Sequence, residues 1–145
     1  MATFDFSWSP NDDSGPRISV LIQNPLDVLN SGQPEHFGLP APIPAMALVD
    51  TGAGISAVSK VLAQTRKLRL TNEGSRIRTL GATLEGAEYA ASVSFPGTRL
   101  RPLVPIRLFS GDFSREPFSC IIGRDILQYW KITFDGPGRR VSISD

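Results

Sequence analysis

The chain of 145 residues contains one cysteine, Cys120, and one histidine, His36. A single cysteine excludes an intrachain disulfide framework. Because Cys120 precedes Ile121 and Ile122, we expect it to be a buried, small hydrophobic residue. His36 has no second histidine and no cysteine cluster to join, so we expect a surface side chain, no metal site and no cofactor.

The sequence also has little net charge and no long apolar runs. A formal net charge of +1 gives no electrostatic reason to expect nucleic acid or an acidic membrane as a partner. No apolar run approaches the length that spans a membrane, and the first six residues lack the basic and apolar regions of a signal peptide. The length and the hydrophobic fraction of 41% predict one soluble domain, residues 1–145, which we expect inside the cell, in the cytoplasm, alone or within a longer precursor.

Short segments with β-propensity, separated by glycine and proline, predict an all-β domain with a small closed barrel-like sheet. An N-terminal arm, residues 1–16, carries Phe4, Phe6 and Trp8 on one face, which either joins the core or contacts another subunit. Residues 24–42 contain four prolines and predict a long loop. The remaining predicted elements are strands at 17–22, 75–80, 89–95, 100–109, 119–123, 131–134 and 139–144, a strand leading into a helical turn at 56–65, and a helix of about two turns at 124–130.

One stretch differs from the rest, because an apolar run leads to a single acid and then breaks into small residues. Residues 45–49 are followed by Asp50, Thr51, Gly52, Ala53 and Gly54. The pattern predicts a buried strand that ends at Asp50 and passes into a tight turn. An acid at this place is either a turn-forming residue or part of a functional site.

Two motifs resemble those of the retropepsin-like aspartic proteases. The first is Leu48-Val49-Asp50-Thr51-Gly52-Ala53, and the second is Ile121-Ile122-Gly123-Arg124-Asp125-Ile126-Leu127. A lone Asp-Thr-Gly would be weak evidence, whereas both motifs in this order make a specific match. The resemblance implies the retropepsin fold with one short C-terminal helix.

The resemblance also implies roles for individual residues. Asp50 would be the catalytic acid and base, and Thr51 would form a hydrogen bond across a dimer. Gly52 would expose its backbone to a peptide substrate, while Ala53 and Gly54 would line the substrate cleft.

A hairpin at Gly81 and Ala82 would be the flap that covers the bound peptide. Arg124 and Asp125 would support the active-site loop, although a solvent-exposed arginine and a capping aspartate are equally consistent with this sequence. In viral members an aspartate commonly follows the Asp-Thr-Gly-Ala motif and pairs with the arginine. Gly54 stands there in this chain, so Arg124 needs another partner, either Asp125 or a backbone carbonyl.

Peptide hydrolysis by this chemistry needs two neighbouring carboxylates that share one proton. The chain has one copy of the motif, and Asp135-Gly136 is not a second, because the hydroxyl residue is missing. We therefore expect a homodimer in which Asp50 meets its symmetry mate, with peptides or proteins as substrates. Two alternatives remain: a catalytically inactive module of the same fold that dimerises or binds peptides, and a domain that processes its own precursor.

Overall fold

The computed structural model describes residues 3–9, 15–25 and 42–145. Most of the predicted loop at 24–42, including His36, therefore lies outside the described residues. The described elements, in chain order, are β1 (Thr3–Ser7), β2 (Arg17–Gln23), β3 (Ile43–Val49), β4 (Ala57–Ser59), α2 (Lys60–Thr65), β5 (Arg69–Thr79), β6 (Ala82–Ser94), β7 (Leu103–Gly111), β8 (Cys120–Ile122), α3 (Arg124–Leu127), β9 (Lys131–Asp135) and β10 (Arg140–Ser144).

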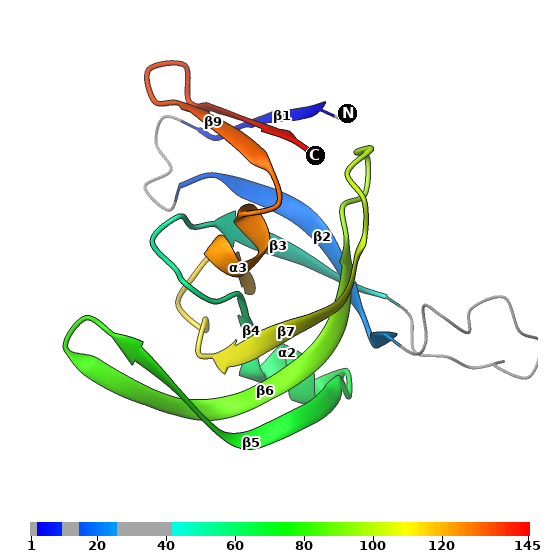
Figure 1. The fold of residues 1–145 in the computed structure, drawn as a ribbon, viewed down its shortest axis with the longest axis vertical. Helices are drawn as coiled ribbons and strands as arrows, with labels where there is room; N and C mark the ends of the chain where they lie inside the picture. Colours follow the sequence, from blue (N-terminus) through cyan, green and yellow to red (C-terminus); the bar gives the residue numbers. More distant parts are fainter. Residues whose placement is uncertain (1–2, 10–14, 26–41) are drawn as a thin grey trace, which may run out of the picture.

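Most of the strands form one sheet that curls into a ring. Their order is β2-β3-β8-β4-β7-β6-β5, and an additional pairing of β2 with β6 joins the two sides of the ring (Figure 1). Inward-facing residues alternate along β2, where Ile18, Val20 and Ile22 are all buried. They join a core built mainly from residues of the ring strands, with others from β10, α2 and α3. The many strands and few short helices confirm the predicted all-β class.

The two ends of the chain meet in a second, three-stranded sheet of order β1-β10-β9. Phe4, Phe6 and Trp8 pack against the core from this sheet, so the predicted aromatic face of the N-terminal arm is a core face. Figure 1 shows this sheet above the ring, with the N- and C-termini close together.

The hairpin of β5 and β6 is longer than the sequence pattern predicted. The second strand begins at Ala82 rather than at residue 89, and the connection is reduced to Leu80 and Gly81. Gly81 adopts a φ of 83°, which a glycine reaches without strain. The hairpin projects from the ring at the lower left of Figure 1.

The C-terminal helix is shorter than predicted. Helix α3 ends at Leu127, and residues 128–130 form turns before β9. Trp130 still packs edge-on against Phe95, with ring centroids 5.0 Å apart, so its burial does not need a longer helix. The described residues also include a second helix, α2, which begins at the N-cap Ser59, and neither helix is long and apolar enough to cross a membrane.

Candidate active site

Parallel pairing of β3 and β8 brings the two sequence motifs together. Leu48 lies opposite Ile121 and Val49 opposite Ile122, so both strands end at the same edge of the sheet. The Asp50 amide extends this ladder by donating to the Ile122 carbonyl at 3.0 Å. The loop after Asp50 and the helix after Gly123 therefore start side by side, although about seventy residues separate them in the sequence.

The Asp50 side chain closes a tight turn. Its Oδ1 atom accepts a hydrogen bond from the Gly52 amide at 2.8 Å, and its backbone carbonyl accepts one from the Ala53 amide at 3.3 Å. Asp50 is half-buried, while Thr51 and Gly52 are exposed. The carboxylate is thus held by its own turn but stays accessible from the side of the loop.

Arg124 binds the loop through backbone carbonyls. Its Nη1 atom donates to the carbonyls of Thr51 at 2.9 Å and Gly52 at 3.4 Å, and its backbone amide donates to the Ala53 carbonyl at 2.8 Å. The sequence left either Asp125 or a backbone carbonyl as the partner of Arg124, and in the structure the partners are backbone carbonyls. A Cβ atom on Gly54 would lie 3.5 Å from the guanidinium, so a side chain here would be a neighbour of Arg124.

Asp125 binds Ser56, a residue that sequence analysis did not single out. The two carboxylate oxygens of Asp125 accept hydrogen bonds from the Ser56 hydroxyl at 2.7 Å and the Ser56 amide at 3.0 Å. The same hydroxyl accepts a hydrogen bond from the Gly123 amide at 2.9 Å. Ser56 is fully buried, and these hydrogen bonds hold the end of the Asp50 loop, residues 50–56, against the start of α3.

Removing the Ser56 hydroxyl should destabilise the protein. Ser56→Ala leaves the Gly123 amide without its acceptor and one Asp125 oxygen without its hydroxyl donor, which should lower the free energy of unfolding by about 2–3 kcal/mol. Urea denaturation measures this loss. Ser7→Ala, at an exposed serine of β1 whose hydroxyl has no hydrogen-bond partner among the described residues, should change it by less than about 0.5 kcal/mol. Equal stability of Ser56→Ala and wild type would contradict the role of this hydroxyl.

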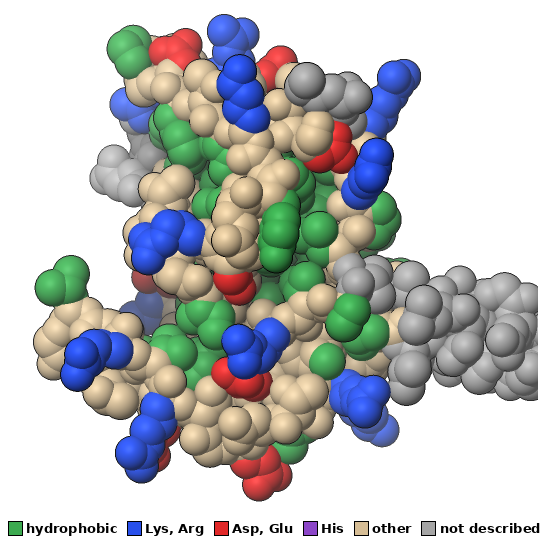
Figure 2. Space-filling view, in the orientation of Figure 1, with side chains coloured by type: hydrophobic (Ala, Val, Ile, Leu, Met, Phe, Trp, Pro, Cys, Tyr) green, Lys and Arg blue, Asp and Glu red, His purple; other side chains and the backbone are tan. Residues whose placement is uncertain are grey.

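A cleft of about 1060 Å³ opens between the active-site loop and the hairpin. Figure 2 shows it as a hollow that contains hydrophobic side chains. Apolar residues come from the loop, from both strands of the hairpin, and from the segments around β7 and β8. They are Ala53, Ile55, Ala57, Ile77, Leu80, Leu84, Phe109, Phe113 and Ile121. An extended peptide with apolar side chains fits such a lining.

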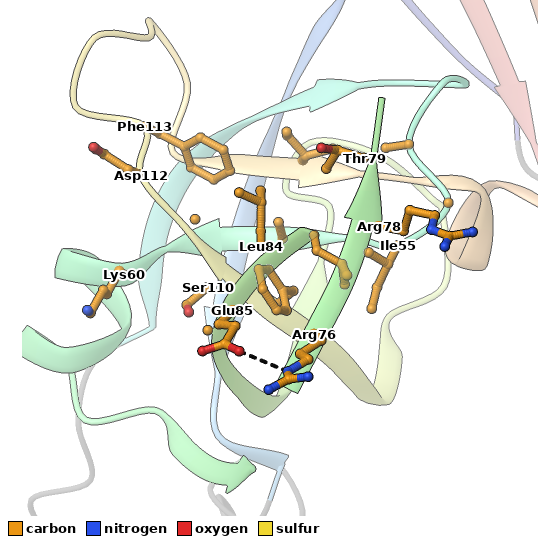
Figure 3. A pocket seen from close by; sticks show the side chains of 18 of the residues that line it. Ile55, Lys60, Arg76, Arg78, Thr79, Leu84, Glu85, Ser110, Asp112 and Phe113 are labelled. Atoms are coloured by element: carbon orange, nitrogen blue, oxygen red, sulfur yellow. Dashed lines mark ion pairs between the residues drawn. The ribbon is translucent and has the colours of Figure 1, made fainter. Parts of the chain in front are cut away.

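Charged side chains surround the apolar lining. The Arg76 guanidinium pairs with the Glu85 carboxylate at 2.9 Å on the hairpin, and Lys60 and Asp112 lie elsewhere on the cleft wall (Figure 3). A hydrogen bond from the Ser114 amide lowers the pKa of Asp112. This carboxylate is therefore still charged in weakly acidic solution.

The predicted site residues do not all line the cleft. Gly52, Ala53 and Gly54 contribute to its wall, whereas Asp50 and Thr51, just before them, are not lining residues. Gly81 and Ala82 lie at the exposed hairpin tip and do not line the cleft either. The lining residues of the hairpin are instead 76–80 and 84–86. Sequence analysis missed the aromatic wall of Phe109 and Phe113, because nothing in a short apolar segment indicates which cavity it faces.

Cys120 lies in β8 beneath the active-site loop and is buried, as its sequence context predicted. Burial, and to a lesser degree the charge of Asp125, raises the pKa of its thiol to about 12, so it is an inert core residue. Within residues 3–9, 15–25 and 42–145, no group of three or more histidine, cysteine, aspartate or glutamate side chains could hold a metal ion.

Comparison with known proteins identifies a family that the chain matches. Residues 38–126 match a family model described as aspartyl protease. That range contains both Asp50 and Arg124, and it covers more than half of the chain. No curated protein sequence matches the chain.

Two solved structures with a similar fold are described as proteases. EIAV protease, in complex with the inhibitor HBY-793, has 24% sequence identity and a TM-score of 0.54, covering 84% of this chain and 93% of the protease. A retropepsin-like aspartic protease from Rickettsia conorii has 19% identity and a TM-score of 0.56, covering 97% of this chain and 90% of the other. At these identities the likeness establishes the retropepsin-like fold.

Proposed function

Because the chain belongs to the aspartyl protease family, we propose that it is an aspartic endopeptidase that cleaves extended peptides with a water molecule activated by Asp50. One observation supports this function above all others. The Asp50 carboxylate lies in a turn that is held by hydrogen bonds from Gly52 and Arg124, and the following residues, Gly52 to Gly54, form part of the wall of a large apolar cleft. A peptide lying in that cleft would pass close to the carboxylate.

The second carboxylate of the reaction comes from another copy of the chain. One Asp50 can activate a water only if a neighbouring carboxyl group carries the shared proton, and the sequence supplies a single motif. A two-fold axis beside the turn would place Asp50 and its symmetry mate together. The three-stranded terminal sheet supports a dimer, because its outer strands β1 and β9 have unpaired edges among the described residues.

The substrate lies between the active-site loop and the β5–β6 hairpin, which acts as the flap. Both walls contribute apolar side chains, Ile55 from the loop and Ile77 and Leu84 from the hairpin. Hydrophobic residues on either side of the cleaved bond would fill this space. Gly81 and Ala82 at the tip reach beyond the cleft wall and would meet substrate or the second subunit only when the dimer is assembled.

Cleavage of a generic peptide library between pH 4 and pH 8 tests this function. A dyad that shares one proton works only below its upper apparent pKa, so the rate should be highest in acid and fall as the pH rises. A rate that still increases through pH 8 would contradict the shared proton. No cleavage at concentrations where sedimentation shows a dimer would favour the alternative, a non-catalytic module that binds peptides.

A further inference from the structure

Glu88 is a buried carboxylate that the proposed chemistry does not use. It lies on β6, and its side chain is 11% exposed. Burying a carboxylate is costly unless polar partners compensate the lost hydration. The partners of Glu88 come from two different strands, one on each side of β6, so they indicate what this side chain does.

Glu88 marks the place where the hairpin leaves the ring. It is the last residue of β6, counted toward the hairpin tip, that pairs with β7, where it lies opposite Phe109. Beyond it, the ladder from Gly86 to Ala82 pairs with β5 alone. The distal part, residues 75–86, is therefore a two-stranded ribbon, and such ribbons hold their direction poorly without further contacts.

The other strand of the hairpin is irregular at the same level. Between Leu70 and Ser75, the register of β5 against β6 shifts twice, so β5 contains extra residues there. Bulges bend a strand and increase its twist, and they leave backbone groups without ladder partners. The ribbon joins the ring through a bent, incompletely paired segment on one side and through Glu88 on the other.

The carboxylate of Glu88 spans this junction. Its Oε1 atom accepts a hydrogen bond of 2.7 Å from the hydroxyl of Ser75, the first residue of the regular ribbon. Its Oε2 atom lies 3.7 Å from Nη1 of Arg107 on β7, which belongs to the ring. The backbone carbonyl of Glu88 also accepts a hydrogen bond from the Thr71 hydroxyl inside the bulged segment, at 3.1 Å.

Two further contacts hold the ribbon against the ring at this level. The Ala87 amide, just past the last β6–β7 pair, donates to the Ser110 hydroxyl at 2.9 Å. A Cβ atom on Gly86 would lie 2.9 Å from both the Phe109 ring and the Ser110 hydroxyl, so glycine permits a close approach. The apolar ribbon residues that line the cleft beyond this level include Ile77 and Leu84, and Figure 3 shows Leu84 directed into it.

We propose that Glu88, Ser75 and Arg107 are positioning residues that fix the angle of the β5–β6 hairpin over the cleft. They thereby place Ile77 and Leu84, the side chains of the hairpin wall that would contact a peptide. This consequence for catalysis rests on the proposed function. Among the described residues, none of the three forms a hydrogen bond or an ion pair with the Asp50 loop. Their effect on peptide binding is transmitted by the ribbon.

Hydrogen–deuterium exchange of the full chain tests the placement of the ribbon without any need for activity. Ser75→Ala and Glu88→Ala should raise the exchange rate of amides in residues 75–86 about tenfold, since each removes the partly buried hydrogen bond between Ser75 and Glu88 at the junction. Amides of the β1-β10-β9 sheet should exchange as in wild type. Glu88→Gln keeps an acceptor for the Ser75 hydroxyl and should restore slow exchange in most of the ribbon.

A matched control separates this effect from a general loss of charge. Glu73→Gln neutralises an exposed carboxylate on β5, the strand that carries Ser75, and should leave ribbon exchange unchanged. Unchanged ribbon exchange in both Ser75→Ala and Glu88→Ala would overturn the proposal. So would equal acceleration in the ribbon and in the terminal sheet, because that pattern means overall destabilisation.

Peptide cleavage by the same variants tests the consequence for binding. In Ser75→Ala, KM should rise about tenfold while kcat changes less than about threefold, because the reacting groups are intact and only the cleft wall is displaced. A kcat that falls with unchanged KM would overturn the positioning role. If wild type itself cleaves no peptide, the proposed function fails, and the exchange data alone decide the role of Glu88.

Discussion

Replacing Asp50 by asparagine should abolish peptide cleavage and leave the fold intact. The amide oxygen of asparagine can still accept the hydrogen bond from the Gly52 amide, so the turn is preserved. The amide can neither take a proton from water nor share one with a second carboxyl group, so kcat/KM should fall by about a thousandfold or more. Initial rates on a cleaved peptide measure the loss of activity, and the thermal unfolding midpoint shows whether the fold is intact.

Asp135→Asn is the matched control for this substitution. Its carboxylate also accepts a hydrogen bond from a turn amide, that of Gly138 at 2.8 Å, but in the connection between β9 and β10. This variant should keep the activity of wild type. Activity of the Asp50→Asn protein within about tenfold of wild type would show that another group activates the water.

Replacing Gly123 by alanine should have the largest effect on stability of any single methyl addition near the site. The added Cβ atom would lie 2.9 Å from three backbone atoms, the Ala53 oxygen and the carbonyl carbon and oxygen of Ile55. Backbone atoms of a loop held by hydrogen bonds cannot move to relieve this steric clash, whereas the end of a flexible side chain could. We expect a loss of about 3 kcal/mol in the free energy of unfolding, and loss of cleavage as the Asp50 loop is displaced.

Gly136→Ala provides the comparison for glycine substitution. A Cβ atom at Gly136 would meet nothing within 4 Å, so its stability should stay within about 0.5 kcal/mol of wild type. Urea denaturation of both variants gives the difference. A Gly123→Ala protein as stable as Gly136→Ala would mean that the loop and α3 do not approach each other as closely as described.

Most of the strands could be predicted from the local sequence alone. Residues 45–49 and 120–122 are apolar runs that end at a turn, and such runs identify buried strands directly. The hairpin was underestimated because β5 is polar, exposed and bulged, and its pairing with β6 rather than any alternation of its own makes it a strand. The length of α3 was overestimated because Trp130 continues the helical spacing although the chain has already turned.

The site residues that lie in recognisable motifs could be predicted from the sequence. Those whose role depends on contacts between distant strands could not. Asp50 and Arg124 stand out in the sequence, each in a recognisable motif. Ser56 lies in a run of small and apolar residues, and the pairing of β8 with both β3 and β4 brings it to Asp125. Glu88 is likewise one acid among several in a polar hairpin until its burial between β5 and β7 is known.

The most direct test of the central claim, a catalytic dyad shared between two chains, is to mix wild type with the Asp50→Asn protein. The mixtures are held at constant total concentration until subunits have exchanged. If each active site needs Asp50 from both chains, an equal mixture should have about a quarter of the activity of pure wild type, because only a quarter of randomly formed dimers contain two aspartates. About half of the activity, in proportion to the wild-type chains present, would mean that each chain works alone and would contradict the shared dyad.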